Sequence, residues 1–172
     1  MKKILYLFVA SITLLSCTKV EKNNNDLQAN NAARMQEFYD QVFNAHNPAM
    51  IDSFCTADIV DHQADPRYPA GINGLKAVFT DYFTAFPDMH VKTNFVKAWG
   101  DTVMAHITMT GTNSGSFMGM PATNKSMNFD GVDFVIIKDG KATEHWGYQE
   151  DGKMMAQLGM GQSAPMDNMT KK

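Results

Sequence analysis

The sequence predicts an α+β fold in which helices pack on one face of an antiparallel sheet. In the first half of the chain, apolar residues recur three and four positions apart, which is the helical period. From residue 89 onward they alternate, and alternation indicates strands joined by short turns. Helices followed by a run of strands are typical of an α+β domain.

Two amphipathic helices are predicted in the first half. The first covers residues 32–44, and the second covers residues 73–86 and ends before Pro87, which cannot continue a helix. Asn47-Pro48 begins a short helix between them, and residues 58–62 form a short extended segment. The apolar stripes of these helices are expected to face the sheet.

The second half is predicted as an antiparallel meander that a helical turn closes. Gly100-Asp101 and Asp139-Gly140 are tight-turn sequences, and a long Gly- and Met-rich loop occupies residues 111–124. Residues 151–158 form the closing helical turn. The predicted strands are 89–99, 102–110, 126–137 and 141–149.

The strand segment 132–137 is apolar on both faces apart from Asp133. One face can cover the helices and a pocket, whereas the other face needs a second cover. A partner subunit is the simplest cover, since two-fold dimers are the commonest soluble oligomers. We therefore expect a homodimer through the convex face of the sheet.

The chain starts with a segment typical of bacterial export. The first methionine is followed by two lysines, then by an apolar run over residues 4–15, and then by Ser16-Cys17. The run is too short to span a membrane, and its end resembles the signal of bacterial lipoproteins, whose Cys becomes the first mature residue and carries acyl chains. Residues 1–17 are then a signal peptide and Cys17 is lipidated. A simple secretory signal with an incidental Cys is the alternative.

A lipidated protein would lie in the bacterial cell envelope, at the periplasmic or surface face of a membrane, held there through its lipid anchor only. The Asn-rich residues 18–31 are predicted as a tether, residues 32–160 as one domain, and residues 161–172 as a flexible tail. The net charge of −3 and the lack of a basic patch argue against nucleic acid as a partner. Once Cys17 is acylated, Cys55 is the remaining cysteine, so an intrachain disulfide is not expected.

Asp133 and His145 are the strongest candidates for chemistry. Asp133 interrupts an apolar strand, where a charged side chain is costly to bury without a partner. The next strand offers His145 beside Trp146. An Asp and a His in an apolar setting can form a tuned acid/base pair. Asp133 is therefore predicted to orient or charge His145, which then serves as the general base.

Three sequence blocks point to a known family through their order and spacing. They are HQADP, then GTNSGSFMGMPATNKSMNFDGVDFVIIKDGKATEHWG, then MMAQLG. In this order they resemble the SnoaL-like polyketide cyclases, and within them the ester cyclase group, over residues 33–159. The resemblance implies the nuclear transport factor 2-like fold, a curved antiparallel sheet wrapped around helices to enclose a cone-shaped pocket. It also implies ring closure of a polyketide by intramolecular aldol condensation, without metal or cofactor.

The resemblance also places pocket residues at particular positions. Asp133 stands where the characterised cyclases have His, and Asp61 stands where they have Asn. Their catalytic Asp corresponds to Gly147, so this acid is missing from its usual place. Because residues two apart share a strand face, Thr143, His145 and Gly147 are expected on the pocket side. The predicted substrate contacts are Asp61, His62, Phe117, Met118, Met120, Val135, Trp146 and Gly147.

Two functions are compatible with these patterns. The first is an enzyme that acts on a small apolar carbonyl or ester compound by acid/base chemistry without a cofactor, and retention of Asp133 and His145 favours it. The second is a non-catalytic lipoprotein that holds a small hydrophobic ligand in the same pocket. Gly147, which carries no acid, favours this second function.

Overall fold

The computed structural model describes residues 24–160, and the predicted signal peptide with Cys17, the start of the tether and the tail lie outside this range. The first helix covers residues 24–38 and continues as a π-helical segment, η1 (Tyr39–Asn44). It therefore includes residues 24–31, which the sequence assigned to the tether. Asn31 explains part of this difference, because its buried side-chain amide donates a hydrogen bond of 3.0 Å to the Gly100 carbonyl.

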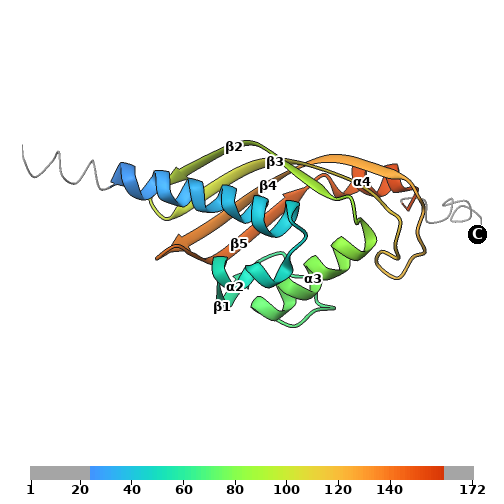
Figure 1. The fold of residues 1–172 in the computed structure, drawn as a ribbon, viewed down its shortest axis with the longest axis horizontal. Coiled ribbons are helices and arrows are strands. Elements are labelled where there is room, and N and C mark those ends of the chain that lie inside the picture. Colours follow the sequence, from blue (N-terminus) through green and yellow to red (C-terminus); the bar gives the residue numbers. More distant parts are fainter. Residues whose placement is uncertain (1–23, 161–172) are drawn as a thin grey trace, which may run out of the picture.

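The remaining helices agree with the prediction. A 3-10 turn, η2 (Pro48–Met50), leads into α2 (Ile51–Phe54), and a loop separates the strand that follows from α3 (Ile72–Ala85). The last helix, α4 (Asp151–Leu158), ends at a left-handed glycine. In Figure 1 the first helix, α2 and α3 all lie on one side of the sheet. The change from helical to strand period along the sequence predicted this arrangement.

Five strands form one open, mixed sheet in the order β1-β5-β4-β3-β2. Neighbouring strands from β2 to β5 pair antiparallel, as predicted. The prediction of an antiparallel sheet is wrong at one edge, because β1 pairs parallel with β5. This pairing is non-local, since α3 and three strands separate the two partners along the chain. The strands are β1 (Cys55–Asp61), β2 (His90–Trp99), β3 (Thr102–Thr112), β4 (Ser126–Lys138) and β5 (Lys141–Gln149).

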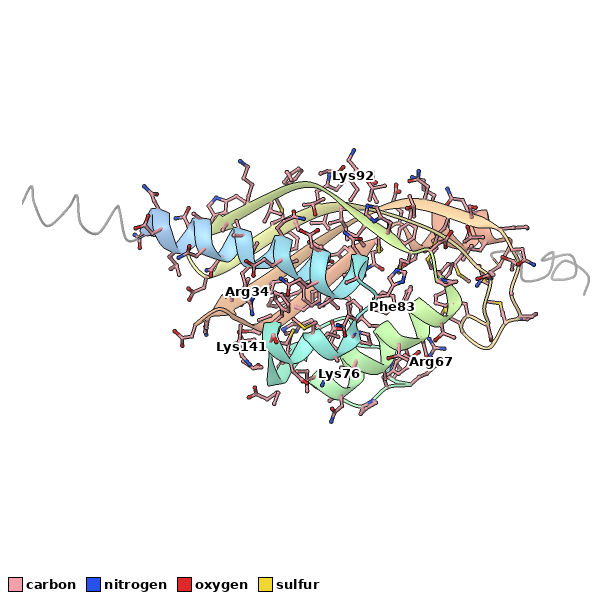
Figure 2. All side chains as sticks on the ribbon, in the orientation of Figure 1. Arg34, Arg67, Lys76, Phe83, Lys92 and Lys141 are labelled. Carbon is pink, nitrogen blue, oxygen red and sulfur yellow. The ribbon has the colours of Figure 1, made fainter. Side chains whose placement is uncertain are left out.

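One face of the sheet and the helices enclose the core. Alternate residues of β3 point inward, so Val103, Ala105, Ile107 and Met109 are all buried. Phe83 of α3 packs edge-on against Phe43 of η1. Charged side chains such as Lys92 project from the opposite side of the sheet (Figure 2). Within the described range, no helix is both long enough and apolar enough to cross a membrane.

Candidate active site

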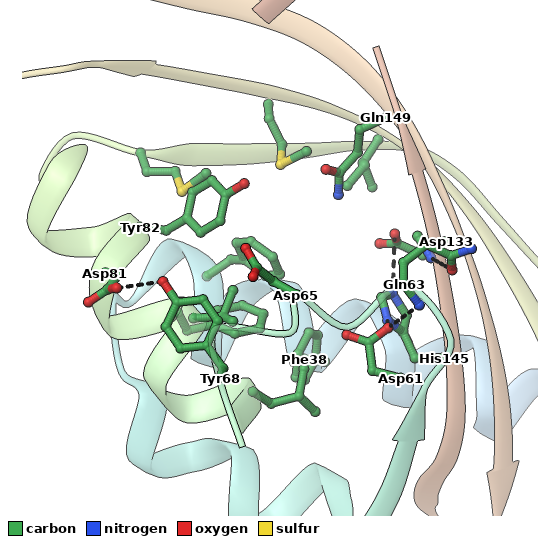
Figure 3. A pocket seen from close by; sticks show the side chains of 18 of the residues that line it. Phe38, Asp61, Gln63, Asp65, Tyr68, Asp81, Tyr82, Asp133, His145 and Gln149 are labelled. Carbon is green, nitrogen blue, oxygen red and sulfur yellow. Dashed lines mark hydrogen bonds and ion pairs between the residues drawn. The ribbon is translucent and has the colours of Figure 1, made fainter. Parts of the chain in front are cut away.

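A cavity of about 810 Å³ lies between the inner face of the sheet and the helices. This volume is in the range of pockets that hold a small organic ligand. Figure 3 shows polar side chains, including Asp61, Asp133 and His145, at one end of the cavity, and Tyr68 and Tyr82 together with Asp81 at the other. Most of the walls are apolar, and they include Met35, Phe38, Phe79, Ile107, Met109 and Met154.

Three ionisable side chains meet at the inner polar end of this cavity. His145 lies between two carboxylates: its Nδ1 is 3.1 Å from Asp61 Oδ1, and its Nε2 is 3.5 Å from Asp133 Oδ1 (Figure 3). The sheet dictates this meeting, because Asp61 and His145 are directly paired across β1 and β5. The sequence predicted the contact of Asp133 with His145 and placed Asp61 near the cavity, but not in contact with His145.

Tyr39 holds the second oxygen of the Asp133 carboxylate. Its hydroxyl donates a hydrogen bond of 2.5 Å to Asp133 Oδ2, and both side chains are buried. Burial, and then the negative charge of Asp133, raise the pKa of Tyr39 well above its usual value, so the phenol keeps its proton. Sequence reasoning missed this role, because Tyr39 falls within the apolar stripe of its helix. The available signal was a phenol in a stripe otherwise free of polar groups.

The environment of His145 favours its protonated form. Burial lowers its pKa, but the hydrogen bonds and charges of Asp133 and Asp61 together outweigh burial and raise the pKa to about 9. Burial alone would raise the pKa of Asp61. The hydrogen bond and charge of His145, together with smaller contributions, outweigh burial, so the pKa of Asp61 is lowered. At neutral pH His145 is therefore an imidazolium ion. This state differs from the prediction that His145 is the general base.

Gly147 leaves open the space in front of the ionic group. A Cβ atom at this position would lie 3.0 Å from His145 Cε1 and 3.3 Å from Asp133 Oδ1. The backbone N–H of Gly147 donates to the Gln63 side-chain oxygen at 3.2 Å. The backbone N–H of Gln63 donates to Asp61 Oδ1 at 3.1 Å. Gln63 thus ties the end of β1 to β5, a role that the sequence did not indicate.

Two of the predicted substrate contacts lie on the opposite face of the sheet. His62 and Trp146 stack on each other with ring centroids 4.0 Å apart, and His62 Nε2 is 3.1 Å from a Glu144 carboxylate oxygen. Their placement in the cavity was wrong, although each directly follows a residue that faces inward. Asp61 and His145 are those inward residues. Trp146 lies in β5, where adjacent residues point to opposite faces, and His62 lies just after the end of β1 and stacks on Trp146.

The loop after β3 contributes fewer contacts than predicted. Phe117 and Met118 line the cavity, as does Val135 on β4. Met120 is not a lining residue; its backbone instead pairs with that of Phe117 in a small bridge. Thr143 also lies outside the lining, because a register shift in β5 turns Ala142 inward and Thr143 Oγ1 toward a backbone carbonyl of β4.

The described residues contain no group of three or more His, Cys, Asp or Glu side chains arranged to hold a metal ion. The inner group consists of one imidazole and two carboxylates, and the two ring nitrogens of the His145 imidazole each contact one of the carboxylates. The predicted absence of a cofactor stays a prediction. What the site offers chemically is an imidazolium ion, a buried carboxylate and apolar walls.

A family model described as SnoaL-like polyketide cyclase matches residues 33–158. The chain belongs to this family. Among curated proteins, none matches this SnoaL-like chain. Its fold is the nuclear transport factor 2-like α+β arrangement that the resemblance implied, with an open rather than a closed sheet.

Several solved structures are similar to this SnoaL-like chain. A candidate polyketide cyclase from Bacillus cereus is 26% identical, with a TM-score of 0.66, and the match covers 76% of this chain and 81% of that one. IdmH from Streptomyces antibioticus, also a candidate polyketide cyclase, is 27% identical, with a TM-score of 0.64 and coverage of 75% and 98%. TsrD from Streptomyces laurentii is 23% identical with a TM-score of 0.70, covering 77% and 96%, which shows the shared fold.

Proposed function

We propose that the protein is an enzyme that moves a proton at carbon in a small apolar carbonyl or ester compound, without a cofactor. The observation that carries this proposal is the pair Asp133 and His145, a carboxylate and an imidazolium 3.5 Å apart at the inner end of an apolar cavity. Membership of the SnoaL-like family and similarity to candidate polyketide cyclases support the same reaction class.

In this mechanism Asp133 is the base and His145 is the acid. Asp133 Oδ1 takes the proton from the carbon next to the substrate carbonyl, and the electron pair of that C–H bond moves onto the carbonyl oxygen. The Nε2–H of His145 donates to this oxygen as its negative charge develops. The enolate carbon then takes the proton back from Asp133, or it attacks a second carbonyl, whose oxygen receives the electron pair of the C=O π bond and takes the proton from Asp133.

Neighbouring groups keep the acid and the base in their roles. Asp61 accepts the Nδ1–H of His145 and so orients the Nε2–H toward the cavity. Tyr39 donates to Asp133 Oδ2, which leaves Oδ1 as the oxygen nearest Gly147 and the substrate. The apolar walls strengthen both interactions because they lower the local dielectric.

Deuterium exchange tests this proposal without knowledge of the natural substrate. Naphthylacetone, an apolar ketone, is incubated with the protein in D2O, and loss of the proton signal next to the carbonyl is followed by NMR. We expect Asp133→Asn and His145→Gln to slow the exchange about a hundredfold or more. Asp130→Asn and His106→Gln are matched controls, because His106 Nε2 lies 3.7 Å from Asp130 Oδ2 on the outer face of β3 and β4. Equal exchange with and without protein contradicts the proposal.

A second candidate function is ligand binding without catalysis. It is favoured because both oxygens of Asp133 already have partners, Tyr39 and His145, and because Gly147 carries no acid. In this function His145 donates a hydrogen bond to the polar end of a hydrophobic ligand. A compound that is extracted unchanged from the purified protein, together with no exchange of naphthylacetone, distinguishes it from the enzyme.

We also propose that Cys17 carries the lipid that holds the domain in the cell envelope. The apolar run followed by Ser16-Cys17 supports this proposal. In a bacterial host, the unchanged protein should sediment with the membrane fraction and take up labelled palmitate. Cys17→Ser should lose the label and move to the soluble fraction; label retained in this variant contradicts lipidation at Cys17.

A further inference from the structure

The outer end of the cavity carries acidic and aromatic side chains that the proposed reaction does not use. We call this region the mouth and define it by Asp65, Arg67, Asp81, Tyr82 and Asp151. Asp65 and Arg67 come from the loop between β1 and α3, Asp81 and Tyr82 come from α3, and Asp151 begins α4. Three separate segments therefore bring three carboxylates to one opening.

The cations that line the cavity are already paired within the described residues. Arg67 binds Asp65 through two nitrogens, with its Nε 2.8 Å from Oδ2. Arg34 lies 2.9 Å from a Glu37 carboxylate oxygen. His145 is held by the two carboxylates at the inner end. None of these three positive charges is left over for the remaining carboxylates of the mouth.

Asp81 and Asp151 make no ion pair with any described residue. Asp81 Oδ2 accepts a hydrogen bond of 2.5 Å from the Tyr68 hydroxyl, which is an uncharged donor. Asp151 has no side-chain partner among the described residues. Its charge acts on the cavity, because burial, and after it the negative charge of Asp151, raise the pKa of Tyr82 to about 12. The opening is therefore negative, and its surplus charge lies at Asp81 and Asp151.

Tyr82 adds a polar atom and an aromatic face to these charges. Its side chain points into the cavity (Figure 3), and its hydroxyl makes no hydrogen bond within the part of the chain that the structure describes. Its ring lies 5.1 Å from the Phe117 ring. Carboxylates beside aromatic rings form an environment that attracts an organic cation.

We propose that the mouth binds a protonated amine, so that the ligand is an apolar compound with an ammonium group at its outer end. The apolar body occupies the cavity, and the ammonium group lies between Asp81 and Asp151 with the Tyr82 hydroxyl as an acceptor. This inference rests on the pocket of the proposed function and names its ligand class. It does not depend on whether that pocket is catalytic.

Three matched naphthalene compounds test the inference by calorimetry at neutral pH: naphthylethylamine, naphthylethanol and naphthylacetic acid. They share an apolar ring system and differ in the charge of the outer group. We expect the amine to bind about tenfold more tightly than the alcohol, and the acid to bind more weakly than both. Asp81→Asn with Asp151→Asn should bring the amine within about twofold of the alcohol.

A matched control removes two carboxylates elsewhere. Asp101 and Asp139 are exposed in the two hairpin turns and do not line the cavity, so Asp101→Asn with Asp139→Asn should keep the preference for the amine. Equal affinity of the amine and the alcohol for the unchanged protein overturns the inference. A preference that persists in the Asp81 and Asp151 double variant overturns the assignment to the mouth.

The outcomes also separate this inference from the proposed reaction. A preference for the amine without exchange of naphthylacetone supports the ligand class and contradicts the enzyme. Exchange of naphthylacetone without a preference for the amine supports the enzyme and contradicts the ligand class. If none of the three naphthalene compounds binds, the inference fails together with the pocket on which it rests.

Discussion

Asp133 and Gly147 are directly opposite each other on β4 and β5, and the Asp133 carboxylate occupies the side of the strand pair where Gly147 has no side chain. The resemblance placed the catalytic Asp of the cyclases at position 147, where this chain has no acid. The cross-strand pairing shows that a carboxylate nevertheless reaches the same wall of the cavity, from the neighbouring strand. The missing acid at Gly147 therefore does not leave this wall of the cavity without a carboxylate.

Gly147→Ala should disturb this arrangement while leaving the fold intact. The new methyl group would lie 3.0 Å from His145 Cε1 and 3.3 Å from Asp133 Oδ1, so the two side chains must move apart. We expect a lower His145 pKa by NMR titration and slower exchange of naphthylacetone. The unfolding free energy should change by less than about 1.5 kcal/mol, since alanine also suits a strand better than glycine. Gly152→Ala, where a Cβ meets nothing within 4 Å, is the control.

The stability of the protein should depend on pH through His145. Because its pKa is raised from 6.5 to about 9 on folding, its contribution is fully present below pH 6.5 and is lost as the pH rises through 9. The loss is of the order of 3 kcal/mol in unfolding free energy. Asp61 affects stability at low pH. Because folding lowers its pKa, its contribution to the unfolding free energy is present at neutral pH and is lost as the pH falls through that lowered pKa.

Asp133→Asn isolates one source of this pH dependence. The variant loses a carboxylate that raises the pKa of His145, so that pKa should fall and the decline in stability between pH 6.5 and 9 should become shallower. Urea unfolding at several pH values measures this slope, and NMR titration measures the pKa. Asp130→Asn, on the outer face, should keep the slope of the unchanged protein. An unaltered His145 pKa in Asp133→Asn would show that the two side chains do not interact.

Tyr39→Phe should destabilise the fold by about 1–3 kcal/mol, because it leaves an oxygen of a buried carboxylate without its donor. Urea unfolding at neutral pH measures the loss. If the hydrogen bond is the cause, Tyr39→Phe should cost much less when Asp133 is already Asn. Equal costs in both backgrounds would assign the effect to packing instead.

Periodicity predicted the parts of this protein that depend on local sequence. The helices, the four strands of the meander and the contact of Asp133 with His145 follow from spacing and from one interrupted apolar run. The parallel pairing of β1 with β5 does not, because it joins residues such as Asp61 and His145 that lie far apart in the chain. That pairing adds Asp61 as a second carboxylate beside His145, and Asp133 and Asp61 together raise the pKa of His145 to about 9.

Two kinds of site residue were misplaced for different reasons. Trp146 was assigned to the cavity beside His145, although strand alternation by itself places the two side chains on opposite faces. Thr143 shares the alternation of His145, but the register shift in β5 turns it away, and such a shift leaves no clear trace in the sequence. Tyr39 was overlooked since a phenol in an apolar stripe is typical of a core residue.

The outer face of the sheet is expected to form a homodimer. Val132, Phe134 and Ile136 alternate toward this face and are only half-buried in the single chain, and Phe134 is paired with Trp146 across β4 and β5. Tyr148, 56% exposed, extends the same surface. An apolar surface of this kind is typical of a subunit interface. We therefore propose that two copies of the chain cover it for each other.

Sedimentation velocity at micromolar concentration measures this association. The unchanged protein should sediment as a dimer, and Phe134→Lys should shift it to a monomer, because a charge at the centre of an apolar interface is costly to bury. Leu27→Lys, on the exposed side of the first helix, is the matched control and should stay dimeric. Circular dichroism checks that Phe134→Lys keeps its fold. A monomer for the unchanged protein would contradict the proposed interface, whereas a dimer unaffected by Phe134→Lys would place the contact on another surface.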